Sequence, residues 1–173
     1  SSLSQTLLKY TAPGIPDLYQ GTELWDLSLV DPDNRRAVDY DRRKKMLEEV
    51  ENISPQQATE KIHRGITKMY VIYNALKVRR QYPESFGSKS SYESVDTGGG
   101  KAGHLIAFER NGDIVTVVPR LLLGLESGWD NTAVTLPRGK WMNVFTKECF
   151  QGTVCAGDLF ERFPVALLTV ERS

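Results

Sequence analysis

The residues best suited to chemistry gather in one stretch of the chain, residues 11–40. Seventeen of these positions, Glu23 to Asp39, hold one Glu, one Trp, four Asp and two adjacent Arg. Carboxylates accept and guanidinium groups donate charge-assisted hydrogen bonds, which are stronger than bonds between neutral groups. A plain surface loop rarely has this composition, whereas a loop that follows a buried strand and lines a polar pocket often does. We therefore expect this stretch to line a polar pocket.

A short helix and a short strand are expected to position that loop. Leucines recur at helical spacing over Leu3–Tyr10, and Pro13 ends the helix. The apolar run Ile15–Tyr19 predicts a strand, with Pro16 at its beginning because proline lacks the N–H that a central ladder needs. A helix that begins this close to the first residue indicates the end of a larger unit.

Helices are expected to follow the loop. One covers Asp41–Glu51, with Asp41 as its N-cap. Ser54 and Pro55 begin another as N-cap and first helical residue, and we expect it to continue to about Tyr82. Its apolar residues recur at helical spacing and predict one buried stripe. The stripe consists of Ile62, Ile66, Met69, Tyr73 and Leu76.

The pattern changes after residue 85 to short strands separated by turns. Asn111-Gly112 is the strongest two-residue hairpin signal, between the strands His104–Arg110 and Asp113–Pro119. Further strands are expected at Thr132–Leu136, Lys140–Phe145, Phe150–Val154 and Val165–Val170. Regular short strands with no helices between them predict an antiparallel β-sandwich.

Composition argues against several classes of partner. The chain has 22 Lys and Arg against 22 Asp and Glu, so no basic excess favours nucleic acid. A transmembrane helix needs about 18 or more apolar residues in a row, and no such run is present. The first residues have neither the basic nor the apolar region of a signal peptide. We expect a cytoplasmic protein that binds neither nucleic acid nor a membrane.

No cofactor or metal site is expected. Neither His63 nor His104 lies close enough in sequence to Cys149 and Cys155 to complete a metal-ligand set. The glycine run at 98–100 lacks the strand–helix context of a phosphate-binding loop. We expect the two cysteines to be free, although a bridge across a tight hairpin remains an alternative.

The order of these features resembles the end of a (β/α)8 barrel of the α-amylase family, glycoside hydrolase family 13, followed by its C-terminal β-domain. PGIPDLYQGTE is similar to the eighth barrel strand of that family, G-x-P-x-x-Y-x-G-x-E, and ELWDLSLVDPDNRR narrows the resemblance to the maltooligosyl trehalose synthases. GWDNTAVTLPRGKWMNVFT and LFERFPVALL resemble the last sheet of those enzymes. The resemblance is weakest at Lys89–Lys101. Ala37 stands where the pattern has Pro, which should loosen the turn after Arg36.

This resemblance implies an α+β fragment with two domains. Residues 1–85 would be the eighth strand, its loop and the trailing helices of the barrel, and residues 86–173 the β-sandwich. A barrel takes about 250 residues, so we expect a C-terminal fragment whose natural partner is the missing N-terminal barrel. The unpaired strand would also permit self-association. The catalytic carboxylates of the family lie on strands four, five and seven, so all are expected before Ser1 and no residue here is taken as catalytic.

The implied enzyme acts on a maltooligosaccharide substrate in trehalose biosynthesis. It converts the reducing-end α-1,4 linkage to an α,α-1,1 linkage through a covalent glycosyl-enzyme, which makes it an intramolecular transglucosidase. Such an enzyme must retain the freed glucose and exclude water, and loops after barrel strands lie at the catalytic face. We expect the fragment alone to be inactive.

The resemblance makes polar and aromatic residues of the loop candidates for sugar contact. They are Tyr19, Glu23, Trp25, Asp26, Asp31, Asp33, Arg35 and Arg36. In related enzymes an Arg of a D-x-x-R element pairs with an Asp to wall off the pocket, and we expect Arg35 or Arg36 in that role. Structural roles stay open as alternatives: an Asx turn at Asp33, a rim anchor at Glu23 and a core position for Trp25.

Two other functions stay open. A free-standing carbohydrate-binding or assembly module would present exposed aromatic residues on one sheet face, for which Trp129 and Trp141 are available. Another α-amylase-family hydrolase or isomerase, acting on trehalose or sucrose, is disfavoured by the ELWDLSLVDPDNRR segment.

Overall fold

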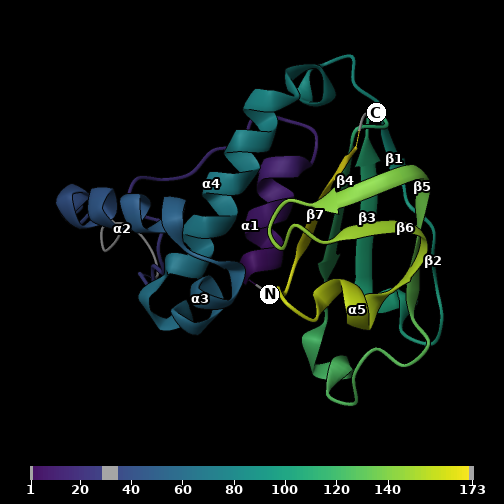
Figure 1. Ribbon diagram of the computed structural model, residues 1–173. Helices are drawn as coiled ribbons and strands as arrows, with labels where there is room; N and C mark the ends of the chain where they lie inside the picture. Colours follow the sequence, from purple (N-terminus) through teal and green to yellow (C-terminus); the bar gives the residue numbers. More distant parts are fainter. Residues whose placement is uncertain (1, 29–34, 172–173) are drawn as a thin grey trace.

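The computed structural model describes residues 2–28 and 35–171 of the 173-residue chain. A group of helices packs against one antiparallel sheet, so the described part of the chain is α+β (Figure 1). The α-helices are α1 (Ser2–Thr11), α2 (Tyr40–Asn52), α3 (Pro55–Glu60), α4 (Ile66–Gln81) and α5 (Ala156–Phe160). Short 3-10 helices are η1 (Ile62–Arg64), η2 (Pro83–Phe86), η3 (Ala102–His104) and η4 (Leu122–Leu125). None of these helices is long and apolar enough to cross a bilayer.

Among the described residues, hydrogen bonds join seven strands into one sheet in the order β1-β3-β4-β7-β5-β2, with β6 paired to β5. The strands are β1 (Tyr92–Ser94), β2 (Thr97–Gly98), β3 (Leu105–Arg110), β4 (Ile114–Pro119), β5 (Ala133–Asn143), β6 (Cys149–Cys155) and β7 (Ala166–Val170). The beginning of β5 pairs with β2 and β6, and its end pairs with β6 and β7. Strand β5 therefore joins two parts of the sheet, and one apolar cluster contains residues of β3, β4, β5, β6 and β7.

Two expectations for the β half are corrected and one is confirmed. The strands expected on either side of residues 137–139 are one strand, β5, because a register shift between Thr135 and Lys140 takes up the extra residues without ending the pairing with β6. The described strands are hydrogen-bonded into one sheet, whereas a sandwich of two sheets was expected. The hairpin itself is confirmed, with φ of 56° and 68° at Asn111 and Gly112, but Arg110 pairs with Ile114, so three residues connect β3 and β4 where two were expected.

Strand β4 is buried on both faces and links two apolar clusters. Ile114 and Val118 lie in a cluster with α1 and α4, whereas Val115 and Val117 lie in a second cluster with residues of β5, β6 and α5. A strand buried on both faces has a nearly continuous apolar sequence, as the IVTVV run of β4 does. The first cluster contains residues from both sides of position 85, and the division into two domains there stays a prediction.

Helix boundaries differ from the expectation in two places. Asp39, one residue before α2, caps this helix through its side chain, so the N-cap expected at Asp41 is wrong. The long helix expected from Ser54 ends as α3 at Glu60, and the 3-10 helix η1 follows; Gly65, with φ of +80°, then ends η1 and precedes α4. The N-cap at Ser54 is confirmed, with Pro55 in the first turn.

The apolar face of α4 is broader than one stripe. Ile66 and Met69 are buried as expected, but Leu76 is 46% exposed, and Ile62 of η1 is 37% exposed. Helix α4 packs against both α1 and α2, which buries further residues around its circumference. These are Thr67, Tyr70, Val71, Ile72, Asn74, Ala75 and Val78.

The strand expected at Ile15–Tyr19 is not formed among the described residues. The segment belongs to no strand, and Ile15 is 96% exposed. A strand needs a neighbour to satisfy its backbone N–H and C=O groups, and no described segment pairs with this one. Pro16 removes one donor in addition. A barrel strand is therefore not formed by the described residues alone.

Candidate functional site

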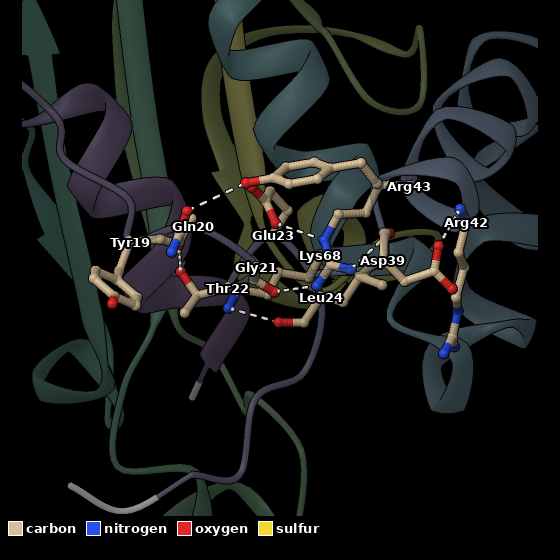
Figure 2. Close-up of polar contacts among 11 residues, drawn as sticks. Tyr19, Gln20, Gly21, Thr22, Glu23, Leu24, Asp39, Arg42, Arg43 and Lys68 are labelled. Carbon is tan, nitrogen blue, oxygen red and sulfur yellow. Dashed lines mark hydrogen bonds and ion pairs between the residues drawn. The ribbon is translucent and has the colours of Figure 1, made fainter. Parts of the chain in front are cut away.

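The acidic loop comprises residues 25–35, and Arg43 of α2 binds the two chain segments that flank it (Figure 2). Its Nε donates to Glu23 Oε2 at 3.0 Å and its Nη2 to the Gly21 carbonyl at 2.6 Å. Its Nη1 donates to the Asp39 carbonyl at 3.0 Å. We call residues 19–24 the first stem, residues 36–39 the second stem, and the group formed by Gly21, Glu23, Asp39 and Arg43 the clasp. One guanidinium therefore joins two stems that are well separated in sequence.

Gly21 allows the two stems to approach each other. Its φ is +90°, in the left-handed region that favours glycine. A Cβ added there would lie 3.1 Å from a Val38 methyl and 3.3 Å from Arg43 Nη2. A larger residue at this position would therefore strain the backbone and press on both the second stem and the clasp.

Lys68 of α4 supports the residues that follow the first stem. Its Nζ donates to the Leu24 carbonyl at 3.2 Å and lies 5.8 Å from the centre of the Trp25 ring. Burial, and next the positive charge of Lys9, lower the pKa of Lys68. The Trp25 indole N–H donates to the Ile62 carbonyl. The half-buried Trp25 is thus oriented by both α4 and η1.

A hollow of about 210 Å³ lies between the stems. Its lining consists of Gln20, Gly21, Trp25, Asp26, Ser28, Arg36, Ala37, Val38, Asp39 and Arg43. Asp26 Oδ1 accepts the Ser28 backbone N–H at 2.9 Å and the Ser28 hydroxyl at 2.7 Å. These bonds, with a smaller contribution from Arg36, hold the pKa of Asp26 below its ordinary value. The hollow therefore presents a carboxylate, a guanidinium and an indole ring near one another.

The structure brings some of the expected site residues together and separates others. Trp25, Asp26 and Arg36 line the same hollow, and Glu23 is engaged beside it in the clasp. Arg35 is exposed next to Arg36. Tyr19 points away from the clasp (Figure 2) and lines a different, polar hollow of about 420 Å³ against α1. Asp31 and Asp33 lie outside the described residues.

Sequence reasoning misses Arg43 and Lys68. Both lie on helices whose charged residues look like ordinary solvated faces, and they follow the acidic stretch rather than belonging to it. Most of their acceptors are backbone carbonyls, which leave no mark in the sequence. The one available signal is that Arg43 follows the capping residue Asp39 by four positions and so lies on the first turn of α2.

The tryptophans that a carbohydrate-binding module would expose serve packing here. Trp141 is 1% exposed, and its Nε1 donates to the Pro137 carbonyl at 2.9 Å. Trp129 is half-buried, with its ring centre 5.2 Å from that of Phe160. The two residues therefore do not form an exposed aromatic platform.

Cys149 and Cys155 are free and exposed at opposite ends of β6.

Comparison with known proteins gives no matching family model. A putative maltooligosyl trehalose synthase of Mycobacterium tuberculosis is 41% identical over 168 residues, which are 96% of this chain and 20% of that protein. The structure of maltooligosyltrehalose synthase from Arthrobacter ramosus aligns with a TM-score of 0.86 and 38% identity, over 98% of this chain and 22% of that one. A further maltooligosyl trehalose synthase crystal structure gives a TM-score of 0.74 at 29% identity. The resemblance is thereby confirmed: nearly the whole chain is similar in sequence and fold to about a fifth of the length of maltooligosyl trehalose synthases.

Proposed function

We propose that this chain is the C-terminal part of a maltooligosyl trehalose synthase and that the loop joining its two stems forms one wall of the sugar pocket. The observation that carries the proposal is the similarity itself, which spans 96% of this chain but only 20% of the relative. In this proposal residues 1–85 contribute the end of the catalytic barrel, and Ile15–Tyr19 becomes its eighth strand when the other strands are present. The exposure of Ile15 and Leu27, 96% and 91%, supports a covering partner.

The hollow between the stems suits a pyranose ring. Trp25 offers a flat apolar face, and Asp26 and Arg36 offer charge-assisted hydrogen bonds to hydroxyl groups. The two hydrogen bonds from Ser28 lower the pKa of Asp26, which favours its carboxylate form as a hydrogen-bond acceptor. Glu23 is paired with Arg43. In this proposal Trp25, Asp26 and Arg36 hold sugar, while the carboxylates that make and break bonds belong to the remainder of the enzyme.

The proposed reaction converts the reducing-end α-1,4 linkage of a maltooligosaccharide to an α,α-1,1 linkage. After the glycosyl-enzyme forms, the freed glucose turns over and its anomeric hydroxyl attacks in place of water. Retention of that glucose separates an isomerase from a hydrolase. We assign this retention in part to Trp25, Asp26 and Arg36, with Arg35 and Arg36 as candidates for closing the pocket wall. Tyr19, Asp31 and Asp33 stay proposed sugar contacts.

The proposal is tested with a chimera in which this chain replaces the matching 22% of the Arthrobacter ramosus enzyme. Incubated with maltopentaose, the chimera is expected to form a maltooligosyltrehalose with little free glucose. The parent enzyme is the positive control, and circular dichroism establishes that the chimera is folded. A folded chimera that forms no such product while the parent does would overturn the proposal.

A further inference from the structure

We propose that Arg43 is a positioning residue that fixes the separation of the two stems and thereby sets the width of the hollow that Asp26 and Arg36 line. The first part rests on geometry alone. Only the last step, that this width governs how sugar is held, rests on the proposed function.

The geometry of the guanidinium makes Arg43 a link between chain segments. Its three hydrogen bonds reach a carbonyl on the first stem, a carbonyl on the second stem and the carboxylate of Glu23. A guanidinium holds its donors in one rigid plane, so acceptors bound to three of its nitrogens are fixed relative to each other. A lysine in its place could pair with Glu23 but could not bridge both carbonyls in that plane.

Helix α2 gives the link a firm base. Met46 and Val50 of this helix are 3% and 2% exposed and belong to the large apolar cluster shared with α4. The Arg43 side chain itself is only 18% exposed, and hydrogen bonds away from bulk water are electrostatically stronger. The position of the stems is therefore tied to the helical core.

The clasp acts on the hollow from its edge. Arg43 contributes to the lining beside Gln20 and Asp39, yet all three of its nitrogens donate to protein groups. It thus acts through the stems and not as a principal sugar ligand. Tyr40 Oη donates to Gln20 Oε1 at 3.3 Å and forms a second, weaker tie between the same parts of the chain. Loss of Arg43 should consequently widen the hollow without detaching the loop.

The first test measures hydrogen exchange in this chain for Arg43→Met, Arg43→Lys and the matched control Arg42→Met. Arg42 is the exposed neighbour on the same helix. The Thr22 amide, which donates to the Tyr19 carbonyl at 3.0 Å, should exchange about tenfold faster or more in Arg43→Met, the effect of losing one or more charged hydrogen bonds. Arg43→Lys should be intermediate, and Arg42→Met unchanged. Equal exchange in Arg43→Met and Arg42→Met would overturn the clasp.

The second test measures how the chimera divides maltopentaose between free glucose and maltooligosyltrehalose. Arg43→Met should raise the glucose share severalfold, Arg43→Lys should restore it in part, and Arg42→Met should leave it unchanged. A variant with faster Thr22 exchange but an unchanged product ratio would show a merely structural clasp and overturn the positioning role.

If the unsubstituted chimera makes no product, the proposed function fails, whereas the exchange measurement still decides whether Arg43 holds the stems. Should Arg43→Met not fold, Arg43→Lys serves in both tests.

Discussion

The sheet and the acidic loop differ in where their side chains find partners. In β4, Ile114, Val115 and Val117 are fully buried among side chains of this same chain. In the segment around the loop, Ile15 and Leu27 are 96% and 91% exposed, while the polar stems are tied down by Arg43 and Lys68. Among the described residues the strands pack within the chain, whereas the segments that flank the loop are tied to the helices by Arg43 and Lys68 and leave Ile15 and Leu27 exposed. This is the arrangement expected of a site wall that a further part of the proposed enzyme covers.

The largest expected difference between the regions is in backbone protection. Amides of Ile114–Val118 should exchange at least about a thousandfold more slowly than those of Ile15 and Asp17–Tyr19, because core strands open only at a free energy near that of global unfolding. Hydrogen exchange with mass spectrometry on the purified chain measures both segments together. Comparable protection in the two segments would show that another copy of the chain, or a segment of this one, covers residues 15–19.

Truncation of an apolar side chain should lower the free energy of unfolding in the core and leave it nearly unchanged in the exposed segment before the loop. Phe145 is fully buried, with its ring centre 4.9 Å from that of Phe163. Phe145→Ala should lower the free energy of unfolding by about 3–5 kcal/mol, as large-to-small substitutions in a core do. Ile15→Ala, at an exposed position, should change it by less than about 0.5 kcal/mol. Urea denaturation followed by circular dichroism measures both values, and a large loss in Ile15→Ala would contradict the comparison.

A smaller effect is expected on product partition. In the chimera, Arg36→Ala should raise the ratio of free glucose to maltooligosyltrehalose severalfold, because it removes a cation from the wall of the hollow. Arg35→Ala tests the neighbouring candidate, and Arg42→Ala serves as an exposed arginine on α2 outside the hollow. Chromatographic quantification of both products gives the ratio. An unchanged ratio in both Arg35→Ala and Arg36→Ala would remove the pocket-wall role.

The smallest effect concerns the protonation of Asp26. Its carboxylate should titrate below its ordinary pKa of 3.8, because Ser28 donates two hydrogen bonds to it. A lowered pKa in the folded state means that any stabilisation is present above pH 3.8 and is lost as the pH falls through the lowered pKa. Carbon-detected NMR should show the pKa rising toward 3.8 in Ser28→Ala. A pKa that does not respond to Ser28→Ala would contradict this account of Asp26.

What the sequence predicted correctly rests on local chemistry. The Asn111-Gly112 hairpin needs only two residues that accept positive φ, and the Ser54 cap needs only a side-chain oxygen before the first helical turn. The strand expected at Ile15–Tyr19 depends on a neighbour, which no local pattern supplies. Helical periodicity did not reveal the interruption at Gly65, because residues on both sides of it follow helical spacing.

For the site as well, features set by local residue types were predicted, and features that depend on contacts between distant residues were not. The clustering of polar residues pointed to the loop, and Trp25, Asp26 and Arg36 do line one hollow. The clasp could not be predicted, because two of the three acceptors of Arg43 are backbone carbonyls, which every residue has. Tyr19 is a candidate because its flat ring suits a sugar, but it lines a different hollow against α1, which its residue type does not reveal.

The central claim is that this chain holds sugar while the bond-making carboxylates lie elsewhere in the proposed enzyme. The most direct measurement compares the purified chain and the chimera, at equal concentration, for turnover of maltopentaose. The account predicts neither maltooligosyltrehalose nor glucose from the chain alone, and maltooligosyltrehalose from the chimera. Appreciable turnover by the chain alone would place the catalytic carboxylates among its own residues and contradict the claim.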